Sequence, residues 1–317
     1  MTHPPDPQSA SISLASPTEP IVPAPALVAA ARNPVVLGLR RERRRLLLRR
    51  ILRNPLLLAG FAIFVIMFAA VFLGPFLLNQ DPYAVDPVSR LQPPSAEHPM
   101  GTDGFGRDLL IRVLEGGQVS LLIGLSVTVV SSILALVVGL YSVYFPRLGA
   151  VLMRIADGVM AIPGLLLAIA IAAVLGPSTL NVIIALSIGS IPTAARLIRS
   201  VVLVISSQTY VEALHALGAG PTRILWANIT PNLVPALVVQ ATFMFAGAIL
   251  GEAGLSFVGA GVSPPAPSWG NILQEAQTLV YNAWWMVTFP GLALLLTVLS
   301  TNLVGEGLRA LLAPKGK

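Results

Sequence analysis

The chain has 317 residues, of which 55% are hydrophobic and only 11% are charged, and its mean hydropathy is +0.80. These values exclude an ordinary soluble protein and predict an all-α polytopic membrane protein. The absence of cysteine excludes disulfide bonds, thiol nucleophiles and cysteine-ligated metal sites. The net charge of +6 comes from basic residues that are not arranged for binding nucleic acid.

The N-terminal region changes character near residue 39. Residues 1–38 are rich in proline, serine, threonine and alanine, so we expect a disordered tail. Residues 39–79 combine the basic run Arg40–Arg53 with an apolar run from Pro55 to Leu78. This order is typical of a topogenic signal and lipid-headgroup anchor followed by a transmembrane helix. The apolar run is longer than the h-region of a cleavable signal peptide, so the helix is expected to be retained.

Five further apolar runs are long enough to cross a hydrocarbon core of about 30 Å. They lie near residues 119–144, 157–175, 179–199, 234–258 and 288–312, and we treat 119–312 as the core membrane domain. With the N-terminus in the cytoplasm, the only basic residues left outside are Arg90, Arg107 and Arg112. The positive-inside rule therefore predicts six transmembrane helices with both termini, including the tail 313–317, in the cytoplasm.

The segment between the first two spans, residues 80–118, is predicted to be extracytoplasmic. It begins with proline-rich irregular chain and continues as a helix in which Asp108, Arg112 and Glu115 share one face. Because leucine and valine cover much of the remaining surface, we expect an amphipathic helix lying at the outer interface of the bilayer. An aromatic belt on the same side is expected to contain Trp269, Tyr281, Trp284 and Trp285.

The stretch Thr209–Pro231 is a polar island that the predicted orientation places in the cytoplasm. Thr209 and Glu212 have the spacing of a capping box, so a short helix should begin near Tyr210. Gly218 stands where such a helix needs a residue that adopts the left-handed conformation.

A second helix of the island is expected to begin at Pro221 and to end at Pro231 and Pro235. The first helix carries a stripe of small and apolar side chains that the groove of another protein could approach closely. This stripe consists of Ala213, Ala216 and Leu217. The alternative is an ordinary helical hairpin packed against its own protein.

Ionisable side chains give little material for catalysis in the membrane. None of the three histidines, His3, His98 and His215, falls within a predicted span, and the only lysines are Lys315 and Lys317. An intramembrane histidine-dependent protease, a histidine-ligated metal site and a G-x-x-x-x-G-K-[ST] phosphate-binding loop are therefore excluded. The chain is predicted to be non-catalytic and to hold no cofactor or metal.

The ionisable residues in or beside the later spans are Asp157, Glu252 and Glu306. The first and last are expected at the membrane interfaces. Glu252 is either a pathway or gating residue or a carboxylate hydrogen-bonded across helices, and the nearby glycines favour the packing role. Ser256 and Trp269 are further candidates for a pore or gate. The loop Val258–Trp285 either receives a binding protein or closes an outer gate, and the alternative is a stiff, proline-rich connector.

The polar island resembles the cytoplasmic EAA loop of ABC importer permeases. Glu212, Ala213, Gly218, Ile229 and Pro231 stand at the positions of that pattern. The island departs from the pattern at three places, where Leu214, Asn228 and Thr230 replace the common alanine, histidine and leucine. These replacements could alter the affinity for an ATPase, but they leave the glutamate and the glycine in place.

Residues from His98 to Leu312 resemble the C-type permease subunit of dipeptide, oligopeptide and nickel importers. The resemblance rests on four motifs, HPMGTDGFGRDLL, MRIADGVMAIP, ITPNLVPALVVQAT and EAGLSFVGAGVSPPAPSWGNIL, in the same order and spacing. It implies a type I ABC importer permease fold and an obligate complex in the bacterial inner membrane.

The partners that the resemblance implies are a second permease subunit, two cytoplasmic P-loop ATPases that bind ATP and magnesium, an extracytoplasmic solute-binding protein and the lipid bilayer. The implied ATPase-coupling residues are Thr209, Tyr210, Glu212, Ala213, Leu214, Ala216, Leu217, Gly218, Ile229 and Pro231. The implied solute is a dipeptide or oligopeptide, with nickel or another small solute as the alternative. A stand-alone channel or secondary transporter is the alternative of another class.

Overall fold

The computed structural model describes residues 49–312, and within these residues the regular structure is helical. The expected all-α membrane fold is confirmed. The predicted disordered tail, most of the basic run and the tail 313–317 lie outside the described residues. The helices are α3 (Pro55–Leu78), α4 (Leu109–Tyr144), α5 (Pro146–Met160), α6 (Gly164–Leu175), α7 (Thr179–Ser206), α8 (Thr209–Ala216), α9 (Thr230–Phe257), α10 (Trp269–Ala276) and α11 (Trp285–Leu312), with a 3₁₀ turn at Pro87–Ser89 and a π-helical segment at Arg223–Ile229.

The first predicted span is confirmed as α3, which packs along α11. Its start is capped by Asn54, whose side chain accepts a hydrogen bond from the backbone N–H of Leu57 and donates one to the carbonyl of Gly307 in α11. A Cβ atom at Gly60 would lie 2.7 Å from the Cβ of Leu303, so the two helix backbones approach as closely as glycine allows.

The second span begins earlier than the sequence predicts. Helix α4 runs for 36 residues from Leu109, and Asp108 caps it by accepting from the backbone N–H groups of Leu110 and Ile111. The predicted interfacial helix of segment 80–118 is therefore wrong, because its helical part is the first turns of α4. Those turns pack inside the protein, and even the charged side chain of Arg112 is only 2% exposed.

The third predicted span, 157–175, is not one straight helix. Helices α5 and α6 meet at a 90° bend between Met160 and Gly164. Pro163 cannot supply a backbone N–H group, and it precedes the first residue of α6, so it is compatible with a helix start but not with a helix interior. The described residues therefore contain five long apolar helices as candidate spans, or six when the bent pair is counted as one span.

The remaining spans are confirmed with longer helices. Helix α7 covers the predicted span 179–199, and α11 covers 288–312. The predicted end of the island's second helix at Pro231 and Pro235 is wrong, because the helix continues without interruption from Arg223 to Phe257.

The π-helical segment Arg223–Ile229 allows this continuity. Its wider turn changes the pairing of backbone carbonyls, and polar side chains compensate. Asn228 donates to the carbonyl of Arg223, Thr230 donates to the carbonyl of Leu225, and Asn232 donates to the carbonyl of Asn228. Pro231 follows the π-helical segment directly, so its missing N–H group falls where the backbone pairing changes from one helix type to the other.

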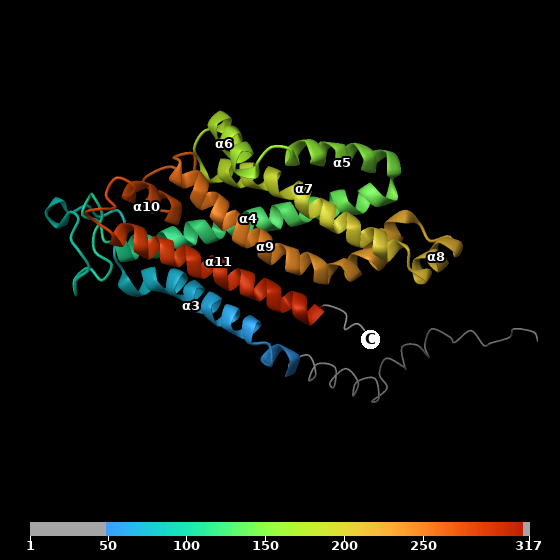
Figure 1. Cartoon of the computed structure of the whole chain (residues 1–317), viewed down its shortest axis with the longest axis horizontal. Helices are drawn as coiled ribbons and strands as arrows, with labels where there is room; N and C mark the ends of the chain where they lie inside the picture. The colour runs from blue at the N-terminus through green and yellow to red at the C-terminus, as the bar shows by residue number, and fades with distance from the viewer. Residues whose placement is uncertain (1–48, 313–317) are drawn as a thin grey trace, which may run out of the picture. The chain divides into compact units, whose positions relative to one another are not determined.

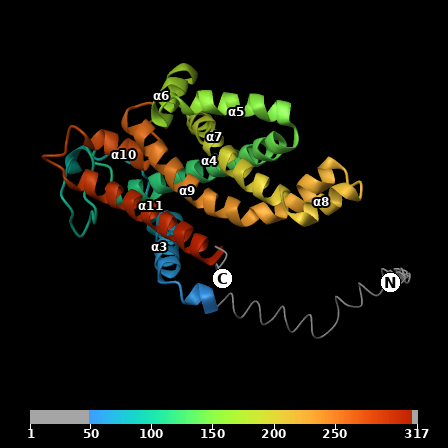
Figure 2. The same ribbon diagram turned by 45° about the vertical axis from the view of Figure 1, so that its right-hand side comes forward.

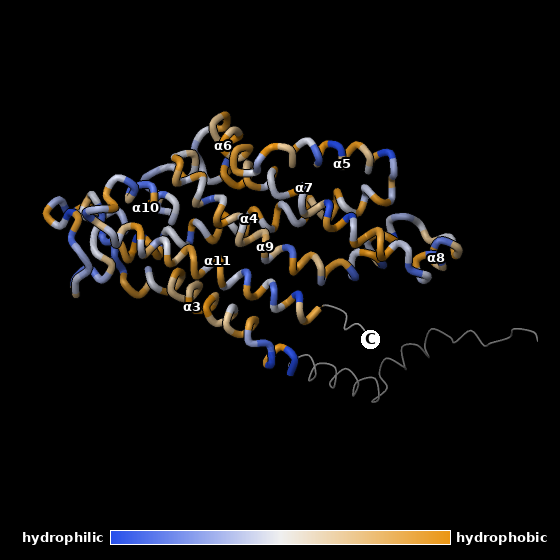
Figure 3. The backbone as a smooth tube through the Cα atoms, viewed as in Figure 1, coloured by the Kyte–Doolittle hydropathy of each residue, from blue (hydrophilic) through white to orange (hydrophobic). Residues whose placement is uncertain are grey.

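The long helices run between two ends of the bundle (Figures 1 and 2). Helix α8 lies at one end, and α10 with the loop 79–108 lies at the other; we call these the α8 end and the α10 end. Apolar residues dominate the lengths of the helices between them, whereas hydrophilic residues gather at the ends (Figure 3). Many apolar side chains of α3 are exposed, including Phe61 and Phe76, as expected for a surface that meets lipid.

Candidate functional site

The first helix of the polar island is present as α8, but it is not capped as predicted. Its N-cap is Gln208, and no side chain accepts a capping hydrogen bond there. The predicted capping box is therefore wrong, because Thr209 is already the first helical residue. Glu212 still lies in the first turn, where its negative charge is favourable at the positive end of the helix dipole.

The glycine elbow after α8 is confirmed. Gly218 has φ +74°, a left-handed conformation in which side chains other than glycine are strained. Its backbone N–H donates to the carbonyl of His215, and the N–H of Ala219 donates to the carbonyl of Leu214, both at 3.0 Å. These two bonds form a Schellman motif, so the end of α8 has a fixed geometry.

Helix α8 has an anchored face and a free face. Val211 is 1% exposed and packs with Ile224, Leu225 and Ile229 of the π-helical segment, and Leu214 joins the same cluster. The free face carries Glu212, Ala213, Ala216 and Leu217, and Leu217 is 82% exposed. Because the anchored face is buried in the bundle, the free face is a rigid surface of small and apolar side chains with one carboxylate, that of Glu212.

The predicted coupling residues divide between these faces. Ile229 belongs to the buried cluster, and Leu214 packs against it. Both residues therefore hold α8 on the bundle. Thr209, Tyr210 and Pro231 are exposed. The hydroxyl of Tyr210 accepts a hydrogen bond from Asn232, which ties α8 to the start of α9. The departure of Leu214 from the EAA pattern therefore changes the packing under α8 rather than its free face.

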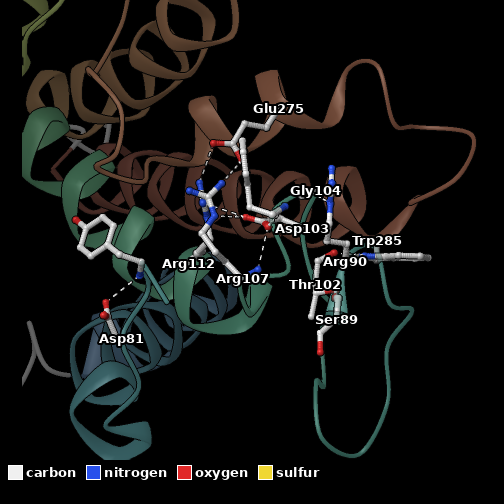
Figure 4. A network of polar contacts seen from close by, with 12 residues as sticks. Asp81, Ser89, Arg90, Thr102, Asp103, Gly104, Arg107, Arg112, Glu275 and Trp285 are labelled. Carbon is white, nitrogen blue, oxygen red and sulfur yellow. Dashed lines mark hydrogen bonds and ion pairs between the residues drawn. The ribbon is translucent and has the colours of Figure 1, made fainter. Parts of the chain in front are cut away.

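At the α10 end, a buried ion-pair network that the sequence analysis missed joins the loop before α4 to α10 (Figure 4). Arg112 contacts Asp103 at 3.0 Å and Glu275 of α10 at 2.9 Å. Arg107 contacts the same two carboxylates at 2.6 and 3.0 Å. Burial raises the pKa of the Glu275 carboxyl above its usual value, whereas the charge of Arg107 acts in the opposite direction.

The loop that carries this network is shaped by its own polar groups. One carboxylate oxygen of Asp103 accepts from the backbone N–H groups of Phe105 and Arg107. The indole N–H of Trp285 donates to the carbonyl of Thr102, and Arg90 donates to the carbonyl of Gly104 (Figure 4). One sequence signal could have indicated this buried network. Asp103 is followed by Arg107 and Arg112, four and nine positions later, next to the apolar start of a helix.

The three candidate pore or gate residues are brought together in the interior. The carboxylate of Glu252 is 0% exposed and accepts hydrogen bonds from the hydroxyl groups of Ser120 and Ser256, both at 2.8 Å. The backbone N–H of Trp269, at the start of α10, donates to the hydroxyl of Ser120. The cluster joins α4, α9 and α10, and its carboxylate does not reach the surface of the described chain.

The predicted aromatic belt is half correct. Trp269 and Trp285 are 0% and 4% exposed, and the indole N–H of Trp269 donates to the carbonyl of Val113. These two tryptophans fill the interior because each indole finds a backbone acceptor there. Tyr281 and Trp284 are 98% and 55% exposed at the α10 end.

The two remaining ionisable candidates are exposed and paired. Asp157 of α5 contacts Arg196 of α7 at 2.5 Å, and Glu306 contacts Arg309 within α11 at 3.7 Å.

Comparison with known proteins identifies the family. The family model described as binding-protein-dependent transport system inner membrane component matches residues 128–317. A second model, the N-terminal TM domain of oligopeptide transport permease C, matches residues 43–94. A solved structure of the MetNI methionine ABC transporter, in an inward-facing conformation, is similar with a TM-score of 0.48 and 24% identity over 61% of this chain and 95% of that chain.

Relatives of known name are similar over most of the chain. A putative peptide transport system permease protein of Brucella abortus is 45% identical over 85% of this chain and 91% of its own length. The di/tripeptide transport system permease protein DppC of Pseudomonas aeruginosa is 44% identical over 80% of this chain and 86% of its own. A probable D,D-dipeptide transport system permease protein of Escherichia coli is 41% identical over 83% of this chain and 88% of its own. The chain therefore belongs to the family of inner membrane components of binding-protein-dependent transport systems, and it is a permease component of such an importer.

Proposed function

We propose that this permease forms one half of a pore for dipeptides or oligopeptides and that the free face of α8 is the seat of an ATPase subunit. The observation that carries the coupling role is the construction of α8. Its free face presents Ala213, Ala216 and Leu217, while Val211 and the Schellman turn hold it rigidly on the bundle. A rigid helix transmits a displacement to the spans that support it, as coupling between two sites requires.

The proposed complex contains a second permease subunit, two cytoplasmic ATPases that bind ATP and magnesium, and an extracytoplasmic solute-binding protein, in the bacterial inner membrane. The α8 end faces the cytoplasm, and the α10 end faces the binding protein. The charge distribution supports this orientation, because the arginines outside under this arrangement are Arg90, Arg107 and Arg112 alone. Two of these three are held in the buried network.

Peptides are proposed as the solute because the named relatives at 41% to 45% identity are peptide and dipeptide permeases. The residues of α8 act in coupling, whereas Glu252, Ser256 and Trp269 act in packing at the α10 end. Their burial and mutual hydrogen bonds support this assignment over a role in lining the pore.

Single cysteines test the partners and the orientation together, because the natural chain contains no cysteine. We expect a cross-linker on Leu217→Cys to capture a P-loop ATPase in intact cells. The matched variant Tyr281→Cys, also strongly exposed but at the opposite end, should instead capture a solute-binding protein, with each partner identified by mass spectrometry. Capture of further copies of this chain alone at both positions would contradict the proposal and indicate a stand-alone channel.

A further inference from the structure

The bend between α5 and α6 leaves backbone uncovered. Ala161, Ile162, Pro163 and Gly164 are all exposed, and no side chain caps the start of α6. Hydrocarbon cannot satisfy free backbone groups, so non-helical backbone in a membrane span is tolerated only where protein covers it or where it borders water. Helix α7 borders the bend through Gly189 and Thr193, and all four residues of the bend nevertheless remain exposed. The exposed side of the α5–α6 pair therefore faces an aqueous space or a neighbouring subunit rather than lipid tails.

An ion pair lies beside this bend. The guanidinium group of Arg196 in α7 donates to the carboxylate of Asp157 in α5 at 2.5 Å. Asp157 stands three residues before Met160, the last residue of α5. Met160 lines a small groove of about 170 Å³ together with Gly164, Gly189 and Thr193. Gly189, Thr193 and Arg196 follow one another at spacings of four and three on α7, so they share one helical face with the groove.

The exposure of this pair shows that stability is not its main contribution. The Arg196 and Asp157 side chains are 51% and 58% exposed, and exposed ion pairs contribute only about 0–1 kcal/mol. Charges that face lipid tails in a span are costly, so charged side chains there usually face a water-filled cavity or a bundle interior. The exposed bend and the exposed ion pair are thus two independent indications that the same side of the α5–α7 surface does not face lipid tails.

We propose that Asp157 and Arg196 recognise the two charged ends of a short zwitterionic peptide as it passes through the pore. The carboxylate of Asp157 offers a partner for the α-ammonium group, and the planar guanidinium of Arg196 offers two parallel donors to the terminal carboxylate. The pair stays neutral in the absence of solute because each group then neutralises the other. This inference rests on the proposed function, which it extends from the solute class to the residues that contact it.

The test is uptake by the complete complex, with its binding protein, in proteoliposomes. We would compare a free dipeptide with its C-terminal amide in Arg196→Gln, and with its N-acetyl form in Asp157→Asn. The same binding protein delivers each pair of solutes, so its preference cancels when the uptake ratio of free to blocked dipeptide is compared between variants. Glu306→Gln, which breaks another exposed ion pair, is the matched control.

We expect each variant to lower the ratio on the order of tenfold, the size of one lost charge-assisted hydrogen bond. Arg196→Lys, which keeps the charge but not the two parallel donors, should restore only part of the ratio. Equal loss for free and blocked dipeptides, or ratios equal to that of Glu306→Gln, would overturn this inference and leave the proposed function standing. Absence of ATP-dependent dipeptide uptake by the unchanged complex would overturn the proposed function, and this inference with it.

Discussion

The buried carboxylate of Glu252 shows how hydrogen bonds stabilise an ionisable group inside this membrane protein. Glu252 lies in α9, and its two oxygens each accept one serine hydroxyl group, from α4 and from its own helix. The serine from α4 also accepts the first backbone N–H group of α10. Removing the carboxylate would therefore leave two serine hydroxyl groups, one in α4 and one in α9, without their acceptor, which is costly in a dry interior.

We predict that Glu252→Leu destabilises the chain by about 3 kcal/mol or more, because the two serine hydroxyl groups lose their acceptor. Glu252→Gln should cost much less, since an amide can pair with both hydroxyl groups. Thermal unfolding of the purified complex in detergent measures the difference, and Glu306→Leu, on an exposed residue, is the control. If Glu252→Gln abolished uptake without lowering the unfolding temperature, the packing role would be wrong and a pathway role would replace it.

Residue chemistry was partly readable from the sequence. The left-handed Gly218 followed from its place after a short helical pattern, and its φ of +74° confirms it. The capping box failed because the spacing of Thr209 and Glu212 cannot show whether a helix starts one residue earlier. The pairing of Asp157 with Arg196 could not be predicted, because it joins two helices whose mutual arrangement depends on the bend between α5 and α6.

At the scale of elements, α10 is held at both of its ends. Its N-terminus meets the serine that bonds Glu252, and near its C-terminus Glu275 pairs with Arg107 and Arg112. The network around Glu275 also contains Asp103, so two arginines face two carboxylates and the group is neutral (Figure 4). This arrangement makes the first turns of α4, the preceding loop and α10 a single unit.

We predict that Arg112→Leu loosens this unit, because it leaves Asp103 buried with one cation fewer and Glu275 held by Arg107 alone. Removing one partner of a buried ion pair typically costs about 3–5 kcal/mol. Hydrogen exchange of the α10 backbone amides in the complete complex should become much faster, whereas Arg147→Gln, on an exposed arginine of α5, should leave it unchanged. Unchanged exchange in Arg112→Leu would contradict the role of the network in holding α10.

The helices show where sequence patterns succeed and where they fail. Long apolar runs gave α3, α7 and α11 with correct placement, since hydrophobic length is a direct requirement of the bilayer. The start of α4 was missed because charged residues at 103–112 are paired by tertiary contacts rather than exposed. The helix end predicted at Pro231 was wrong, because a π-helical segment and three polar side chains keep the helix continuous there.

At the scale of the whole molecule, the bundle separates two ends with different properties. The α8 end presents a small, rigid apolar surface, and the α10 end is locked by buried polar groups. Helices α4, α7 and α9 pack against one another between these ends, and the proposed coupling requires them to pass a displacement of α8 to the spans that would line the pore. This connection is the physical basis of the proposed coupling between an ATPase and the pore.

The central claim is that the fixed geometry of α8 couples ATP hydrolysis to transport, and one pair of variants tests it most directly. Gly218 requires a left-handed backbone, whereas Gly220 has no positive φ and a Cβ there meets nothing within 4 Å. In proteoliposomes containing the complete complex, we predict that Gly218→Val lowers ATP-driven dipeptide uptake about tenfold while the protein stays inserted, because a β-branched side chain in this conformation costs on the order of 1–2 kcal/mol and shifts the turn. Gly220→Val should transport like the unchanged complex. Normal uptake by Gly218→Val would contradict the account.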